Sequence, residues 1–253
     1  MVKGDPRPPL MFPGGGGSTT AYRKIRKYFR RLFKFDQMDF QFAAWQMFYL
    51  LMAPQKLTKV FRARKNFKSQ YARDDPAFLI LFVAALFITS IGFAVALDYG
   101  PRQFFKFIAV EIFVDCIGIG LVIATGLWYV TNRFLKPKQV PQDVEWGFAF
   151  DIHLNAFFPP LILLHFFLII FYNLFLYREG STVSVVLGNF FWLAAAIYYV
   201  YITFLGYNSM QILRNIHLFL APIPWLVFAY LCTVYMGFNI SRAVFEMYRQ
   251  RVV

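Results

Sequence analysis

Residues 77–97 read AFLILFVAALFITSIGFAVAL, a run without a charged residue that stands between Pro76 and Asp98. A helix of this length is about 30 Å long, which matches the hydrocarbon thickness of a bilayer. Similar apolar runs lie at 107–130, 159–177, 183–205 and 216–240. The sequence therefore predicts an all-α, polytopic membrane protein in which residues 77–253 form a bundle of about five transmembrane helices.

The composition agrees with this fold class. Hydrophobic residues make up 59% of the chain and charged residues only 15%, whereas soluble domains carry roughly 25%. A soluble domain needs a charged surface, but lipid-facing helices do not, because hydrocarbon surrounds them. The two cysteines, Cys116 and Cys232, fall in apolar stretches, and we interpret them as core residues.

Two segments precede the bundle. Residues 1–20 are rich in proline and glycine and are predicted to be disordered. Residues 21–76 form a basic amphipathic region, in which apolar residues recur at helical spacing from Tyr22 to Phe33. The candidate basic helix consists of Arg23, Lys24, Arg26, Lys27, Arg30, Arg31 and Lys34. Such a helix is typical of one that lies in the membrane interface and binds anionic headgroups, or alternatively of a nucleic-acid-binding arm.

A second amphipathic element follows at residues 36–53. Its apolar part, 42–53, is roughly 18 Å long as a helix and is too short to cross a bilayer. We expect it to lie in the interface or to pack under the bundle.

The basic residues predict an orientation. The net charge is +13, and 16 of the 26 Lys and Arg residues precede Asp74. With five spans, the side that holds the amino terminus carries 20 Lys and Arg residues and the other side carries 6. The positive-inside rule then places the amino terminus in the cytosol and the carboxyl terminus in the lumen.

An intramembrane polar cluster is predicted from Glu111, Asp115 and His165. The two carboxylates are four residues apart, which places them on one face of an α-helix. A carboxylate inside the hydrocarbon must pair, be protonated or face the bundle interior. The cluster predicts either a proton or cation path, or a structural clamp to Thr89, Ser90 or His165.

A cytosolic docking segment is predicted at residues 143–155, which precede the third apolar run. On a helix, Asp143, Gly147, Asp151 and Asn155 would line one stripe while Trp146 and Phe148 face elsewhere, so the segment would present an acidic and aromatic exposed surface. This surface could pair with the basic helices of the same chain or receive a partner. The candidate residues are Asp143, Glu145, Trp146, Phe148, Asp151, His153 and Asn155.

Sequence motifs for catalysis are not recognised. The three histidines are scattered without metal-ligand spacing, and no glycine-rich phosphate loop or nucleophile motif is present. The sequence predicts no catalytic residue, no metal and no cofactor.

Four stretches together resemble one family. They are RRLFKFDQMDFQFAAWQM at 30–47, ARDDPAF at 72–78, DVEWGFAFDIHLNAFFP at 143–159 and YYVYITFLGY at 198–207. They resemble the "uncoordinated-fifty" family of small multispanning Golgi proteins, and the resemblance covers residues 22–253. It implies residence in Golgi and early secretory membranes, with the endoplasmic reticulum and inner nuclear membrane as further locations.

The resemblance also implies partners. The fungal member associates with large guanine-nucleotide exchange factors for Arf GTPases, and animal members support surface delivery of nicotinic acetylcholine receptors. We therefore expect a non-enzymatic membrane adaptor that recruits an Arf exchange factor through residues 40–51 and 143–155. Two alternatives remain open: an ion- or proton-coupled transporter or channel that uses Glu111 and Asp115, and RNA binding through the basic amino-terminal region. The oligomeric state is not predicted.

Overall fold

The computed structural model of the chain describes residues 30, 34–56, 58–59, 62, 75–171 and 181–252. Every regular element in these ranges is a helix, and five helices are long and apolar enough to cross a membrane. The predicted all-α, polytopic fold is therefore confirmed. The spans cover Ala77–Ala96, Pro101–Leu135, Trp146–Phe171, Thr182–Asn208 and Ile216–Tyr235.

Several spans consist of consecutive helical segments. The first span is α4 (Ala77–Ala96), and the second joins α5 (Pro101–Ala109), the π-helix η2 (Val110–Gly118), α6 (Ile119–Val130) and the π-helix η3 (Thr131–Leu135). The third joins α7 (Trp146–Leu161), the π-helix η4 (Ile162–Phe167) and α8 (Leu168–Phe171). The fourth is α9 (Thr182–Asn208), and the fifth joins the 3₁₀-helix η6 (Ile216–Leu220) to α10 (Pro222–Tyr235). The remaining elements are the 3₁₀-helix η1 (Phe35–Gln37), α2 (Phe40–Met52) and α11 (Ile240–Val252).

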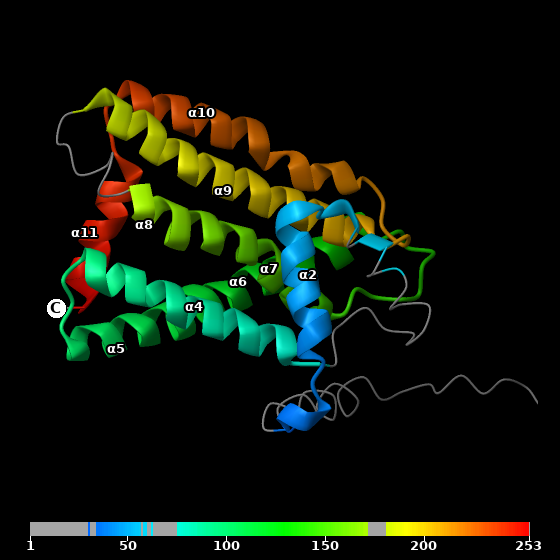
Figure 1. Cartoon of the computed structure of the whole chain (residues 1–253). Coiled ribbons are helices and arrows are strands. Elements are labelled where there is room, and N and C mark those ends of the chain that lie inside the picture. The colour runs from blue at the N-terminus through cyan, green and yellow to red at the C-terminus, as the bar shows by residue number, and fades with distance from the viewer. Residues whose placement is uncertain are drawn as a thin grey trace, which may run out of the picture.

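Two short helices lie across the spans. Figure 1 shows α2 crossing one end of the bundle and α11 crossing the opposite end. An odd number of spans requires this placement, because the chain enters the bundle at one end and leaves it at the other. The short apolar segment at 42–53 thus packs across the bundle, as one of its two predicted arrangements requires.

Three predicted span boundaries differ from the structure. The second span is longer than 107–130, because Pro101 occupies its first turn and Gln103 Oε1 accepts a hydrogen bond from Gly100 N (2.9 Å). The third span begins at Trp146 rather than at residue 159, so its two prolines lie inside the helix. These prolines remove backbone donors, and the helix continues beyond them as the wider η4. The fifth span ends at Tyr235 rather than at 240.

α7 occupies the centre of the bundle and packs against α2, α4, α6 and α9. Glycines on its neighbours allow the close approach, as small residues commonly do between transmembrane helices. A Cβ atom at Gly206 of α9 would lie 2.4 Å from Cδ1 of the buried Ile152. A Cβ atom at Gly120 of α6 would lie 2.6 Å from Nε2 of His153.

Gly206→Ala should destabilise the bundle, because the added methyl group overlaps Ile152 and forces α7 and α9 apart. We expect a loss of about 1–3 kcal/mol in the free energy of unfolding, measured by reversible unfolding in micelles. Gly126→Ala is the matched control, since Gly126 is exposed and an added Cβ meets nothing within 4 Å. Equal stability of the two variants would contradict the close α7–α9 contact.

The positions of α2 and α11 predict opposite accessibility of their surfaces. Gln41 of α2 and Gln250 of α11 are both exposed. In a background in which Cys116 and Cys232 are replaced by alanine, we expect Gln41→Cys and Gln250→Cys to react with a membrane-impermeant maleimide from opposite sides of sealed vesicles. If both cysteines react from the same side, the five-span arrangement is incorrect.

Candidate functional site

The basic amino-terminal helix is largely beyond the described residues. Arg30 and Lys34 are described, and both are exposed. The other members, Arg23, Lys24, Arg26, Lys27 and Arg31, lie outside the described residues, so the role of this helix stays a prediction.

α2 is anchored at its amino-terminal end. Asp39 caps the helix, since its Oδ1 accepts a hydrogen bond from Phe42 N (2.8 Å). The Asp75 carboxylate accepts one hydrogen bond from Asp39 N (2.9 Å) and another from Ala77 N (3.0 Å). One carboxylate therefore joins the start of α2 to the start of the first span.

The inner face of α2 is tied to α7 and α9 farther along. The buried Gln46 donates from Nε2 to Oδ1 of the buried Asn155 (3.0 Å). The Tyr198 hydroxyl donates to the carbonyl of Leu50 (2.9 Å), and just beyond the helix Gln55 donates to the Tyr201 hydroxyl (2.9 Å). These bonds reach α2 in its middle and near its carboxyl end, so its orientation on the bundle is fixed.

The outer face of α2 is apolar and exposed. Phe48 is 58% exposed, and large apolar side chains extend along the same helix: Phe42, Trp45, Phe48 and Met52. Aromatic side chains at this position suit both the membrane–water interface and the centre of a protein interface. The cation of Lys56 lies over the Tyr49 ring, 4.8 Å from its centroid.

The predicted docking segment at 143–155 is largely not a surface. Asp143 and Trp146 are exposed and Glu145 is partly buried, and Asp143 forms an ion pair with Lys136. The expectation of exposure is wrong for the rest of the segment, which is buried: Phe148, Asp151, His153 and Asn155. The reason is that α7 already begins at Trp146 and is surrounded by other helices.

Two of these buried polar residues contact neighbouring helices directly. Asn155 accepts the hydrogen bond from Gln46 of α2 described above. His153 Nδ1 lies 2.8 Å from the Tyr199 hydroxyl of α9. The polar stripe that the sequence suggested for solvent or a partner therefore holds α7 to the rest of the chain.

Glu111 lies at the centre of an intramembrane hydrogen-bond cluster. Its side chain is 2% exposed, and its Oε2 accepts a hydrogen bond from Ser90 Oγ (2.8 Å). His165 Nε2 lies 3.3 Å from Glu111 Oε1, while His165 Nδ1 lies 3.5 Å from Thr89 Oγ1. The cluster therefore connects α4, η2 and η4.

Asp115 does not join this cluster. Its two carboxylate oxygens accept hydrogen bonds from one Arg251 nitrogen of α11, at 3.1 and 3.3 Å. Glu111 and Asp115 lie in the π-helix η2, where hydrogen bonds run from i to i+5 and four residues make less than one turn. The two carboxylates thus serve different neighbours, and the partners considered for Asp115 surround Glu111 instead.

The inner face of α11 packs near the Asp115–Arg251 pair. Phe245 contacts the Phe93 ring with centroids 5.5 Å apart, and Tyr248 meets the Phe107 ring edge-on at 5.2 Å. Burial raises the pKa of the Tyr248 phenol, so that this group is neutral at physiological pH. The last apolar run recognised in the sequence ends at residue 240, so the packing face of α11 was not predicted.

Glu111 and Asp115 form pairs with side chains of other helices. No group of three or more His, Cys, Asp or Glu residues that could hold a metal ion is found among the described residues. The Glu111 oxygens are directed at Ser90 and His165, and the Asp115 oxygens at Arg251.

Glu111→Leu should destabilise the bundle by about 1–3 kcal/mol, because it removes the buried carboxylate that joins Ser90 to His165 and leaves His165 Nε2 without that partner. Glu111→Gln is the matched control, since its amide keeps an oxygen for the Ser90 hydroxyl. Unfolding of the purified variants in micelles measures the difference. A leucine variant as stable as the glutamine variant would contradict a structural role for this cluster.

The chain is similar to proteins of one known family along most of its length. The UNC-50 family matches residues 28–249. "Protein unc-50 homolog" of Drosophila melanogaster is 50% identical over 233 residues, which cover 92% of this chain and 84% of the relative. "Protein unc-50" of Caenorhabditis elegans is 50% identical over 232 residues, which cover 92% of this chain and 76% of the relative.

The human relative is similar over the same part of the chain. "Protein unc-50 homolog" of Homo sapiens is 44% identical over 234 residues, covering 92% of this chain and 90% of the relative. These names do not refer to a catalytic activity. No solved structure matches the chain. The resemblance seen in the sequence is confirmed, and this five-span membrane protein belongs to the UNC-50 family.

Proposed function

We propose that the chain is a non-enzymatic adaptor of Golgi and early secretory membranes that recruits an Arf guanine-nucleotide exchange factor. In this role it supports the transport of receptors of the nicotinic acetylcholine receptor type to the cell surface. Family membership supports the proposal, because the resemblance to this family implies residence in Golgi membranes and association with Arf exchange factors. The structural observation that carries it is α2, which is fixed across one end of the bundle and has an exposed aromatic face.

A fixed helix is suited to recruitment for an energetic reason. Binding loses free energy when groups at the interface must first be ordered, and the hydrogen bonds that α2 and its N-cap form with Asp75, Asn155 and Tyr198 already order this helix. Aromatic side chains often dominate the binding energy of protein interfaces. Trp45 and Phe48 are two exposed aromatic members of the α2 face.

The distribution of charge in the sequence supports a cytosolic position for this surface. The sequence before the first span contains 16 Lys and Arg residues, and the positive-inside rule favours the cytosol for the side on which that segment lies. Anionic headgroups at the cytosolic leaflet would attract the same charges. Arg62, which follows α2, is held by a hydrogen bond from its guanidinium to the Asn208 carbonyl (3.4 Å).

The proposal is tested by the double variant Trp45→Ala/Phe48→Ala in proteoliposomes that contain anionic lipid. Loss of two aromatic anchors should weaken binding of a purified Arf exchange factor by about tenfold or more, measured by co-flotation. The matched control is Phe105→Ala/Phe113→Ala, which removes two exposed phenylalanines of the second span. Unchanged binding in the α2 variant, or an equal loss in the control, would contradict docking on α2.

The transporter alternative has less support from the geometry. Glu111 is paired with Ser90 and His165, whereas Asp115 is paired with Arg251 of α11, so the two carboxylates do not share one continuous polar path. RNA binding by the basic amino-terminal helix concerns mainly residues outside the described ranges, and no described contact favours it over binding of headgroups.

A further inference from the structure

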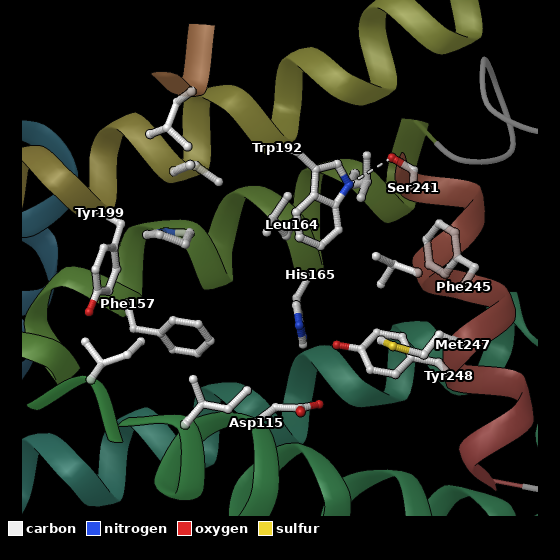
Figure 2. A pocket seen from close by; sticks show the side chains of 18 of the residues that line it. Asp115, Phe157, Leu164, His165, Trp192, Tyr199, Ser241, Phe245, Met247 and Tyr248 are labelled. Carbon is white, nitrogen blue, oxygen red and sulfur yellow. Dashed lines mark hydrogen bonds between the residues drawn. The ribbon is translucent and has the colours of Figure 1, made fainter. Parts of the chain in front are cut away.

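A large cavity lies among the helices of the bundle, beside α11. Its volume is about 580 Å³, and α6, α7, α9, α10 and α11 all contribute to its walls. A second cavity of about 370 Å³ continues it between α6, α9 and α10, and the two share Ile123, Tyr199, Val200 and Pro222. Figure 2 shows residues of α11, including Ser241 and Tyr248, along one side and Tyr199 at the far side. Together the two spaces form one elongated groove.

The groove opens toward the bilayer. Ile119 lines it and is nevertheless 47% exposed. This residue stands near the middle of the helix Pro101–Leu135, at the depth of the hydrocarbon. A transmembrane helix is surrounded by hydrocarbon at this depth, so the material that reaches the apolar part of the groove through this opening is hydrocarbon.

The dimensions fit an acyl chain. The wall from His153 to Leu168 is about 22 Å long at the rise of a helix. An apolar cavity of about 150 Å³ takes up one benzene molecule, and on the same scale 580 Å³ admits about 20 carbon atoms. A partner's transmembrane helix, about 10 Å wide and 30 Å long, occupies about 2,400 Å³ and does not fit.

One part of the wall is polar and charged. Arg251 and Asp115 both line the cavity and pair with each other. The Arg251 side chain remains 39% exposed, and the pair occupies only one of its guanidinium nitrogens. A guanidinium with free N–H groups beside an apolar cavity is suited to a phosphate oxygen. Ser241 lies on the same helix, and its hydroxyl oxygen accepts a hydrogen bond from the indole N–H of Trp192 (3.1 Å).

We propose that this groove is a binding site for one glycerophospholipid of the surrounding bilayer. One acyl chain lies in the cavity between α6, α7, α9 and α10, and the phosphodiester group is bound by Arg251 of α11. The site is separate from the α2 face, so it does not depend on recruitment of an exchange factor.

The test uses the full chain in phosphatidylcholine vesicles that contain a photoactivatable phosphatidylcholine with a diazirine near the end of one acyl chain. After irradiation, mass spectrometry should locate the label on cavity residues such as Leu164 and Ala196. Ala196→Phe fills the cavity and should lower this labelling about tenfold, since about two buried methylene groups are worth that factor. Ala84→Phe is the matched control, because Ala84 is exposed on α4 and does not line the cavity.

The headgroup is tested with the double variant Asp115→Asn/Arg251→Gln, which removes both charges together. Retention of phosphatidylcholine through detergent extraction, measured by native mass spectrometry, should fall about tenfold as charge-assisted hydrogen bonds are lost. Val200→Phe replaces Ala196→Phe if the latter is not monodisperse. Labelling that is equal in the cavity-filling and Ala84→Phe variants would overturn the site. The headgroup assignment would be overturned by two results together: cholesterol displaces the photoactivatable lipid, and the Asp115→Asn/Arg251→Gln variant retains as much phospholipid as the parent.

Discussion

Polar side chains placed in hydrocarbon have no water to bond, and this constraint determines how the helices of the bundle are joined. Glu111 illustrates it: an unpaired carboxylate at its depth would cost at least about 2.5–3.5 kcal/mol. Its oxygens are instead directed at Ser90 of α4 and His165 of η4. Because the partners belong to different spans, satisfying one group fixes the relative positions of three helices.

The two cross helices are attached by the same means. Gln46 of α2 reaches into the bundle to Asn155 of α7. At the other end, Asn189 of α9 donates to the Phe238 carbonyl (2.7 Å) and accepts from Ile240 N (2.9 Å). These bonds hold the turn that leads into α11, so each surface helix is oriented by an amide inside the bundle.

The sequence predicts the parts of this structure that depend on length and composition. The run at 77–97 needs only a count of apolar residues, and the structure places a span at Ala77–Ala96. The start of the third span is different, because Asp151, His153 and Asn155 make a buried helix resemble a surface helix. The interhelical contacts Asn155–Gln46 and His153–Tyr199 join residues more than 40 positions apart, and no local pattern reports them.

For α11 the signal was present in the sequence. Ser241, Phe245, Tyr248 and Val252 recur at helical spacing, and the first, second and fourth of these are buried. The π-helix η2 has no comparable sequence signature, so the separation of Asp115 from Glu111 could not be predicted. The sequence identified Ser90 and His165 as possible clamp partners because both interrupt apolar runs, but it considered them for Asp115, and in the structure they surround Glu111.

The face of α2 and the groove are connected through consecutive residues of α9. Tyr198 donates its hydroxyl to the Leu50 carbonyl of α2, whereas Tyr199 lines the groove and contacts His153. A movement of α9 that widens or narrows the groove therefore acts directly on the carboxyl end of α2. A neutral hydrogen bond contributes about 0.5–1.5 kcal/mol, so the Tyr198 bond alone limits such coupling to roughly tenfold in affinity. The buried Gln46–Asn155 bond acts against larger movements, because displacing α2 would break this hydrogen bond between the Gln46 Nε2 donor and the Asn155 Oδ1 acceptor inside the protein.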